Sequence, residues 1–271
     1  MNLALLQVAE AEVRFGGVHA LRGVNLDVEP GRVTGLIGPN GAGKTTLFNA
    51  ICGLQTLNGG HISFDGKSMH GLRPHHRARL GIARTFQRLE VFTSLSVHEN
   101  VLASAEIRRR WSKDRSNATE NADSVLALVG LSELCHQPAD TLPTGQARLL
   151  ELARSLASRP RLLLLDEPSS GLSDAESDEL GDLLVQLAGA GMAILLVEHD
   201  MGLVMRICDR INVLDFGSVL TVGTPAEIRA DERVRAAYLG AMDDEEEPAV
   251  EHHDPHLVAA FPAPSLVGHD G

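Results

Sequence analysis

Aromatic residues are scarce in this chain, at 3% of 271 residues, although hydrophobic residues make up 44%. Aliphatic side chains must therefore fill most of the core, and a mass of 29.0 kDa allows one large domain or two small ones. No apolar run approaches the roughly 20 residues that a membrane-spanning helix needs. We therefore expect any membrane role to come through a separate partner.

The chain also lacks the marks of a secreted protein. Cys52, Cys135 and Cys208 show neither metal-binding nor redox spacing, and their odd number provides no disulfide framework, which is typical of a reducing cytosol. The apolar run Leu3–Val8 has no basic residues before it and is soon interrupted by acidic ones. We interpret this run as a strand and not as a signal peptide.

Lys and Arg are absent from residues 243–271, where the acidic residues are Asp243, Asp244, Glu245, Glu246, Glu247, Glu251, Asp254 and Asp270. These acids carry most of the formal net charge of −12, a sign that argues against nucleic acid as the main partner. An acidic run rich in Pro and His is typical of a solvated, flexible tail, which we expect at 241–271. Metal binding by His252, His253 and His256 is the alternative.

Several short apolar runs bounded by turn residues predict strands: Leu5–Phe15, Val18–Val28, Val33–Ile37, His61–Phe64, Leu162–Leu165, Ile194–Val197, Ile211–Leu214 and Val219–Val222. A helix is predicted at Thr45–Ile51, with Gly53 as its stop. Further helical segments at about 174–189 and 201–208 separate the later strands. That alternation favours a parallel sheet with crossover helices, and therefore an α/β fold.

Residues from about 88 to 157 lack long β-branched runs. Apolar residues recur there with helical spacing, as in Val125, Leu126, Val129 and Leu131, and in Leu149, Leu150, Leu152, Ala153 and Leu156. We therefore expect a helical insertion between the early and the late strands.

A glycine-rich loop follows the apolar run Val33–Ile37 and precedes the predicted helix. It fits the pattern G-x-x-x-x-G-K-[ST], and its residues are Gly38, Pro39, Asn40, Gly41, Ala42, Gly43, Lys44 and Thr45. Its backbone amides and the helix N-terminus would attract a phosphate. Lys44 would lie between the β- and γ-phosphates, Thr45 would offer its hydroxyl to Mg²⁺, and Thr46 would reach the α-phosphate. A glycine-rich turn that binds nothing is the alternative.

The run Leu162–Leu165 ends in two carboxylates, Asp166 and Glu167. Ligands gather at the carboxyl ends of the strands in open parallel sheets. Asp166 would therefore orient Mg²⁺ through its waters, and Glu167 would polarise the water that attacks the γ-phosphate. The alternative is a strand that runs out into a solvated turn at Pro168.

With these two motifs in place, the chain resembles the ABC ATPases over about residues 5–240. The resemblance implies a P-loop NTPase (RecA-like) fold: a mixed-sheet core, an N-terminal antiparallel β subdomain and an inserted α-helical subdomain at about 88–157. It implies that Phe15, upstream of the phosphate loop, stacks on the adenine. It also implies that Gln87 contacts Mg²⁺ and senses a transmembrane partner. An ordinary core phenylalanine and a surface glutamine are the alternatives.

The family signature corresponds to Leu142–Gln146, where the resemblance implies that Thr144, Gly145 and Gln146 cap the γ-phosphate held by a second subunit. His199 matches the histidine that holds the γ-phosphate and the attacking water; a structural histidine is the alternative. Pro143 and Thr144 replace the usual Ser-Gly of the signature. The segment Ser169–Asp174 corresponds to the family's interface loop, which crosses the interface between two subunits. Ser173 and Asp174 replace the usual Asp and Pro there, so coupling between the two nucleotide sites of the dimer can differ.

Within the family the chain looks most like ATP-binding subunits of branched-chain amino-acid importers, as indicated by the strings Arg84-Thr85-Phe86-Gln87 and Val197–Met201. Residues 100–124 are fewer than is usual in that group. The resemblance implies ATP and Mg²⁺ as cofactors. The expected partners are transmembrane permease subunits, a second ABC ATPase subunit and, indirectly, an extracytoplasmic solute-binding protein. We expect a peripheral location on the cytoplasmic face of the inner membrane.

Other readings remain open at this point. The same motor could serve a transporter for urea or short amides, or a lipid export pump, because the contacts with the solute lie in other subunits. A soluble ABC ATPase acting on nucleic acid or the ribosome is a further alternative. Such proteins commonly carry two ATPase domains or a long coiled-coil insertion, whereas this chain has one phosphate loop and no heptad run.

Overall fold

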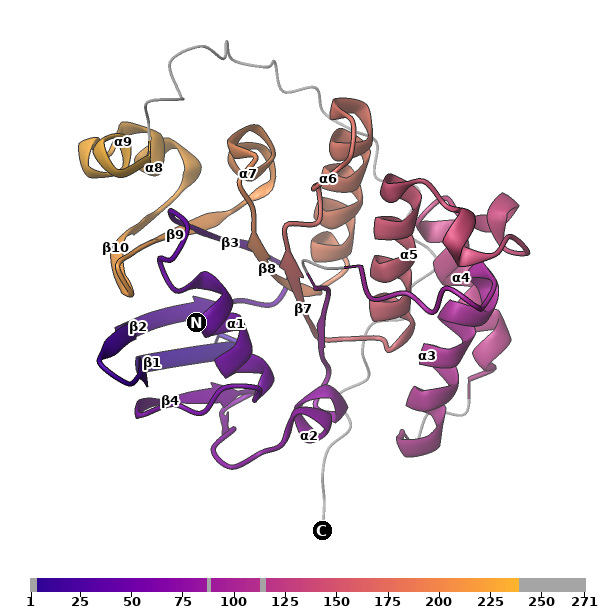
Figure 1. Cartoon of the computed structure of the whole chain (residues 1–271), viewed down its shortest axis with the longest axis horizontal. Coiled ribbons are helices and arrows are strands. Elements are labelled where there is room, and N and C mark those ends of the chain that lie inside the picture. The colour runs from indigo at the N-terminus through magenta and orange to yellow at the C-terminus, as the bar shows by residue number, and fades with distance from the viewer. Residues whose placement is uncertain (1–3, 87–88, 113–115, 239–271) are drawn as a thin grey trace.

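The computed structural model describes residues 4–86, 89–112 and 116–238, which fold around two sheets (Figure 1). The smaller sheet is antiparallel in the order β2-β1-β4-β5. Its strands are β1 (Leu6–Phe15), β2 (Val18–Val28), β4 (Gly59–Phe64) and β5 (Lys67–Ser68). The predicted N-terminal strands are therefore present, and β1 begins one residue later than expected.

The larger sheet is mixed and has the order β10-β9-β3-β8-β7-β6. Its strands are β3 (Val33–Ile37), β6 (Ile82–Arg84), β7 (Leu162–Asp166), β8 (Ala193–Val197), β9 (Arg210–Asp215) and β10 (Ser218–Gly223). Neighbours from β9 to β6 pair in parallel, and β10 pairs antiparallel with β9. The fold is therefore α/β, as the alternation of strands and helices predicts.

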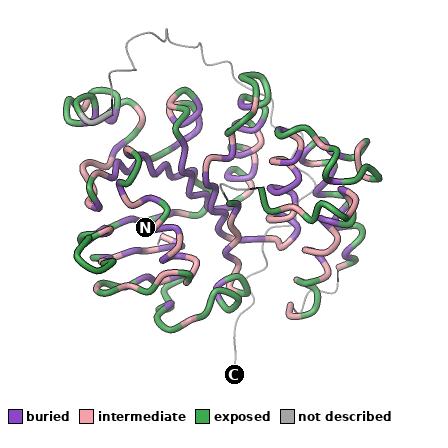
Figure 2. Tube along the Cα trace, in the orientation of Figure 1, coloured by how far each residue is buried: buried purple, intermediate pink, exposed green. Residues whose placement is uncertain are grey.

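Both faces of the larger sheet are covered, which explains why its central strands are continuous apolar runs. Successive side chains of a strand point to opposite faces. In β7, Leu163 and Leu165 pack into one hydrophobic cluster, and Leu162 and Leu164 pack into the other. Figure 2 shows the resulting band of buried residues through the middle of the molecule.

Helices cover one of these faces, and helix α1 (Lys44–Cys52) with the antiparallel sheet covers the other. The other helices are α2 (Pro74–Arg79), α3 (Val97–Trp111), α4 (Ala118–Leu128), α5 (Thr144–Ala157), α6 (Asp174–Gly189), α7 (Met201–Ile207), α8 (Pro225–Ala230) and α9 (Glu232–Tyr238), with 3₁₀ turns at Ser132–Leu134 and Ala139–Thr141. Figure 1 shows α3, α4 and α5 packed together on one side of the larger sheet. These three helices occupy the expected helical stretch. No helix in the described ranges is both long and apolar enough to cross a bilayer.

The prediction of one helical face from Val125 to Leu131 is wrong at its end. Helix α4 stops at Leu128, and Gly130 then adopts a left-handed φ of 73°, which favours glycine and breaks the helical path. Leu131 is nevertheless fully buried, because the chain turns back onto the same cluster. The predicted tail at 241–271 lies outside the described residues, and the domain boundary near 240 stays a prediction.

Arg77 in α2 holds the C-terminal end of the phosphate-loop helix. Its guanidinium donates hydrogen bonds to the carbonyls of Ala50 and Ile51, at 2.7 and 2.8 Å, and to those of Met69 and Leu72. The last carbonyls of a helix lack donors from a following turn. This buried side chain supplies a donor to the Ile51 carbonyl and a second one to the Ala50 carbonyl, which also accepts from the Gly53 N–H at 3.2 Å. Burial lowers the pKa of Arg77 from its ordinary value, although the group stays charged.

We expect Arg77→Met to lower the free energy of unfolding by about 3 kcal/mol or more, because it removes the hydrogen bonds of a buried guanidinium to four carbonyls. Chemical denaturation followed by circular dichroism measures this change. Arg79→Met is the matched control, since Arg79 is exposed on the same helix and should change stability by about 0.5 kcal/mol at most. Equal effects of the two substitutions would contradict the proposed capping of α1.

Candidate functional site

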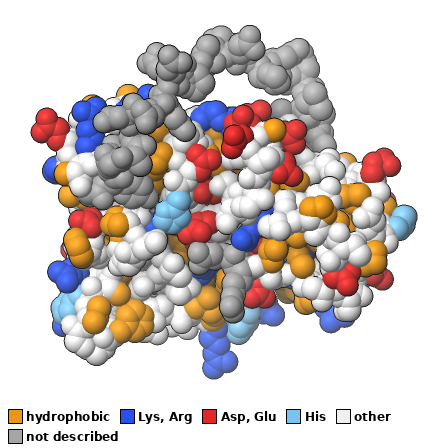
Figure 3. All heavy atoms as spheres, turned by 45° about the horizontal axis from the view of Figure 1, so that its top comes forward, with side chains coloured by type: hydrophobic (Ala, Val, Ile, Leu, Met, Phe, Trp, Pro, Cys, Tyr) orange, Lys and Arg blue, Asp and Glu red, His pale blue; other side chains and the backbone are white. Residues whose placement is uncertain are grey.

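Three motifs meet at the carboxyl edge of the larger sheet. Strands β3, β8 and β7 are consecutive neighbours and run parallel. The glycine-rich loop leaves β3, His199 follows β8, and Asp166 ends β7 with Glu167 directly after it. Their side chains therefore converge where open α/β sheets bind ligands. On the face shown in Figure 3, acidic, basic and histidine side chains lie close together near the middle.

The loop backbone is shaped by glycines that approach other strands. Gly43 has a φ of 108°, and a Cβ atom there would lie 2.6 Å from the Ala20 carbonyl oxygen of β2. A Cβ at Gly38 would collide with the Leu214 carbonyl oxygen of β9. Gly41, with a φ of 83°, faces open space, with nothing within 4 Å of its added Cβ. The loop thus packs closely against the sheets at two glycines and faces open space at the third.

Lys44, the first residue of α1, is buried, and its ammonium turns back onto its own loop. It donates to the carbonyl oxygens of Gly38 and, at 3.2 Å, Pro39. Burial lowers its pKa, and the charges of Glu167 and Asp166 act in the opposite direction. The two carboxylates therefore lie within electrostatic reach of the loop lysine. Thr45 is exposed and Thr46 half-buried in the same first turn of α1.

Asp166 is buried and forms an ion pair that sequence reasoning missed. Arg84, at the end of β6, donates from Nη2 to Asp166 Oδ2 at 2.9 Å and from Nη1 to Asn49 Oδ1 of α1 at 2.6 Å. The guanidinium also lies over the rings of Phe48 and Phe86, at 5.4 and 4.9 Å from their centroids. Arg84 thereby joins the carboxylate of β7 to the phosphate-loop helix.

Glu167 and His199 contact each other directly. The Nε2 atom of His199 lies 2.9 Å from Oε1 of Glu167. Glu167 adopts a left-handed φ of 51°, uncommon for a residue with a side chain, while its N–H donates to the Val197 carbonyl of β8 at 2.8 Å. The bend ends β7 and turns the carboxylate towards the histidine. Strain of this kind is frequent at functional sites.

The signature residues lie at the N-terminus of α5, beside the predicted interface loop. Thr144 is exposed and Gln146 half-buried, so this helix end is open to a partner. A Cβ on Gly145 would meet Glu176 Oε1 at 2.8 Å, and one on Gly171 would meet Thr144 Cγ2 at 3.0 Å. Close backbone packing therefore fixes the signature against the start of α6.

The substituted residues of the interface loop have a local role. Ser173 caps α6 by accepting from the Glu176 N–H, and the Glu176 carboxylate accepts from the Ser173 N–H in return. These hydrogen bonds from Ser173 lower the pKa of Glu176. Ser173 and Asp174 are thus good residues for a helix start, with Asp174 in the first turn.

The structure shows the exposure of most of the remaining predicted site residues. Phe15 ends β1 and is 51% exposed, so its ring is available for stacking and is not a core residue. In the loop, Asn40 is exposed, Pro39 is half-buried and Ala42 is buried. Gln87 lies outside the described residues, and its predicted role stays a prediction.

Two family models match different parts of the chain. A family model described as ABC transporter matches residues 21–170, and one described as branched-chain amino acid ATP-binding cassette transporter matches residues 218–244.

Relatives match over nearly their whole length. The high-affinity branched-chain amino acid transport ATP-binding protein BraF of Pseudomonas aeruginosa is 41% identical over 253 residues, covering 89% of this chain and 99% of BraF. Its counterpart LivG of Escherichia coli K12 is 39% identical with the same coverage. Among solved structures, a nucleotide-free ATP-binding cassette from an ABC transporter has a TM-score of 0.78 at 28% identity, covering 88% of this chain and 100% of that one.

We expect Lys44→Ala to weaken nucleotide binding by about 100-fold, because it removes a charge-assisted donor from the loop. Titration with a fluorescent ATP analogue measures the affinity. Lys67→Ala is the control, since Lys67 is exposed in β5 and away from the cradle. An ATP affinity that Lys44→Ala leaves unchanged would contradict the assignment of the phosphate loop.

Proposed function

The chain belongs to the ABC transporter family of ATP-binding proteins, and from that membership we propose that it drives the import of branched-chain amino acids by hydrolysing ATP. The observation that supports the site most strongly is the convergence of the Lys44 loop, Asp166, Glu167 and His199 at neighbouring strand ends. ATP binding and hydrolysis are the activity of the family. The roles of individual residues below are part of the proposal.

The triphosphate would lie in the cradle at Gly41, where an added Cβ would meet nothing. The Lys44 ammonium would exchange its bonds to the loop carbonyls for bonds to the β- and γ-phosphates. The amides of Asn40, Ala42 and Gly43, with the hydroxyl of Thr46, would cover the remaining phosphate oxygens. Phe15 supports this orientation, since its exposed ring offers a stacking surface for the adenine.

The donors available for Mg²⁺ are hard oxygens, which suit that ion. They are the Thr45 hydroxyl and the Asp166 carboxylate, with Gln87 as a further predicted contact. No cluster of three or more His, Cys, Asp or Glu suited to a metal occurs among the described residues, which agrees with an ion held largely by phosphates and waters. Mg²⁺ would neutralise charge on the transferring phosphate.

Hydrolysis would use the Glu167–His199 pair. The Glu167 carboxylate would accept a proton from the attacking water, and His199 would hold both Glu167 and the γ-phosphate. The opposite face of the γ-phosphate would be covered by Thr144, Gly145 and Gln146 of a second ATPase subunit, either another copy of this chain or a relative. The reaction depends chiefly on positioning and charge neutralisation.

Transport requires further subunits. As a transporter ATPase the chain works with transmembrane permease subunits, to which it attaches peripherally. We propose that this attachment is on the cytoplasmic face of the inner membrane and that an extracytoplasmic binding protein delivers the solute. The names of the relatives and the match at residues 218–244 support branched-chain amino acids as that solute.

We expect Glu167→Gln to keep ATP affinity within about two-fold and to reduce hydrolysis by about 100-fold or more, because the amide is nearly isosteric but cannot take a proton. The assembled transporter should then retain ATP through gel filtration. Glu179→Gln, at an exposed position of α6, is the control and should hydrolyse ATP normally. Normal turnover by Glu167→Gln would rule out Glu167 as the base.

The solute can be tested on the extracytoplasmic receptor that works with this transporter. We expect calorimetric titration of the purified receptor to show binding of leucine, isoleucine and valine, and no binding of urea or short amides. Uptake of labelled leucine into vesicles should then require this chain and ATP. A receptor that binds urea or amides alone would contradict the proposed solute and would leave the ATPase assignment intact.

A further inference from the structure

Residues 84–86 connect two parts of the molecule that act at different nucleotide sites. On one side they pair with β7: the Thr85 N–H donates to the Leu164 carbonyl at 3.0 Å, and Arg84 holds Asp166. This side belongs to the site that binds ATP in the chain's own loop. We call Arg84, Thr85 and Phe86 the 84–86 bridge.

On its other side the bridge is held by α5, the helix that begins with the signature. The Phe86 N–H donates to Glu151 Oε1 at 3.0 Å, and the Phe86 carbonyl accepts from Arg148 Nη1 at 3.0 Å. Arg148 and Glu151 also pair with each other, at 3.4 Å. One turn further along, Ser155 Oγ donates to the Arg84 carbonyl at 3.4 Å. The backbone N–H and carbonyl of Phe86 are thus both bound by charged side chains of the signature helix.

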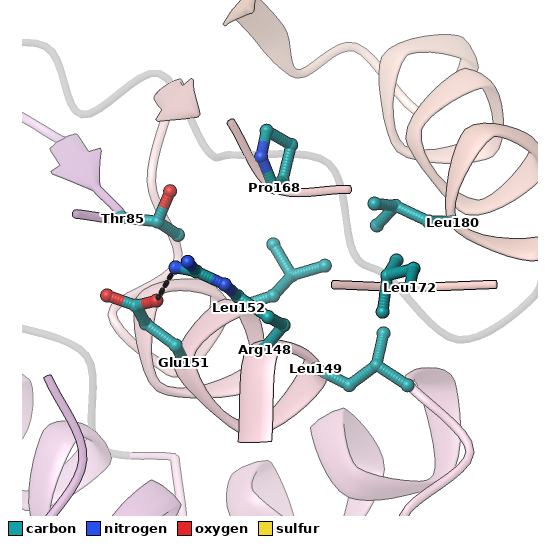
Figure 4. A pocket seen from close by; sticks show the side chains of 8 residues that line it. All are labelled: Thr85, Arg148, Leu149, Glu151, Leu152, Pro168, Leu172 and Leu180. Carbon is teal, nitrogen blue, oxygen red and sulfur yellow. Dashed lines mark hydrogen bonds and ion pairs between the residues drawn. The ribbon is translucent and has the colours of Figure 1, made fainter. Parts of the chain in front are cut away.

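The Glu151 side of these contacts is buried, whereas the hydrogen bond from Arg148 to the Phe86 carbonyl is exposed. Glu151 is 4% exposed, and burial raises its pKa, with the Phe86 N–H and Arg148 acting in the opposite direction. The adjoining cavity, of about 10 Å³, has room for about one water. Figure 4 shows Thr85, Arg148 and Glu151 on one side of this cavity, opposite Pro168, Leu172 and Leu180. The charge-assisted hydrogen bond from the Phe86 N–H to the buried Glu151 carboxylate is of a kind that is strong and has well-defined geometry.

We propose that Glu151 is a positioning residue that, through the 84–86 bridge, fixes the signature helix relative to the chain's own phosphate loop. This inference rests on the proposed function, in which the signature of one subunit covers the ATP of the other. A rigid link between Asp166 and α5 then makes closure at one site favour closure at the other. A loosened link would leave ATP binding to the isolated chain intact and would weaken closure.

The test uses ATP trapped in the assembled transporter carrying Glu167→Gln, with Glu151→Gln added. Glutamine keeps the shape of glutamate and an acceptor for the Phe86 N–H, but its amide faces the Arg148 guanidinium without a charge to pair. We expect trapped ATP to dissociate about ten-fold faster. The ATP affinity of the isolated chain should stay within two-fold. Arg148→Lys is a second variant, which loses the planar fork and should also release ATP faster.

Asn121→Ala is the matched structural control. Asn121 Nδ2 donates to the Ala157 carbonyl at 2.9 Å, so this variant loses a buried hydrogen bond between α4 and α5 away from the bridge. It should lower the melting temperature and leave the release of trapped ATP unchanged.

The outcomes distinguish a failure of the proposed function from a failure of the role proposed for Glu151. Unchanged release in both Glu151→Gln and Arg148→Lys would overturn the inference, as would equally fast release in Asn121→Ala. Failure of the Glu167→Gln parent to trap any ATP would defeat the proposed function first, and the inference with it. Faster release in the Glu151 and Arg148 variants alone, with intact ATP affinity of the isolated chains, would support the bridge.

Discussion

The parallel hydrogen bonding of β3, β8 and β7 is the constraint on which the site depends. Because these neighbouring strands run in one direction, the phosphate loop, His199 and the carboxylates of Asp166 and Glu167 emerge at a common edge. Burial on both faces holds the strands in register, since a slip by one residue would exchange the side chains of the two hydrophobic clusters. The chemistry of the site therefore rests on aliphatic packing.

The parts of the fold that the sequence predicts well are those with a strong local pattern. Val33–Ile37 coincides with β3, and the run from Leu162 needs only Asp166 to match β7. Strand β6 spans only Ile82–Arg84, which is too short to show a local pattern. Its pairing with β7 makes it a strand, and that pairing is not visible in the sequence. Helix α4 was predicted too long because Leu131 is buried without being helical. Local periodicity cannot distinguish a residue buried on a helix face from one buried because the chain turns back onto the core.

In the site, too, residues in local motifs were predicted and residues defined by long-range contacts were not. The two motifs were enough to select Lys44, Asp166 and Glu167 as candidates, and the family resemblance added His199. No role was assigned to Arg84 or Glu151 from the sequence, although Arg84 lies in a string that resembles the importer group. Their contacts join residues 82 and 65 positions apart, and no local pattern encodes such pairs. A buried charge needs its partner in three dimensions, so these roles emerge only from the fold.

The hydrogen bonds from the Lys44 ammonium to the carbonyls of its own loop have a consequence for product release. A buried cation that lost its phosphate partners would otherwise be left dehydrated and unpaired, at a large cost in free energy. In the proposed cycle, the loop carbonyls would substitute for the departing phosphate oxygens. Part of the free-energy cost of product release would thereby be removed, which suits an ATPase that must release its products in every catalytic cycle.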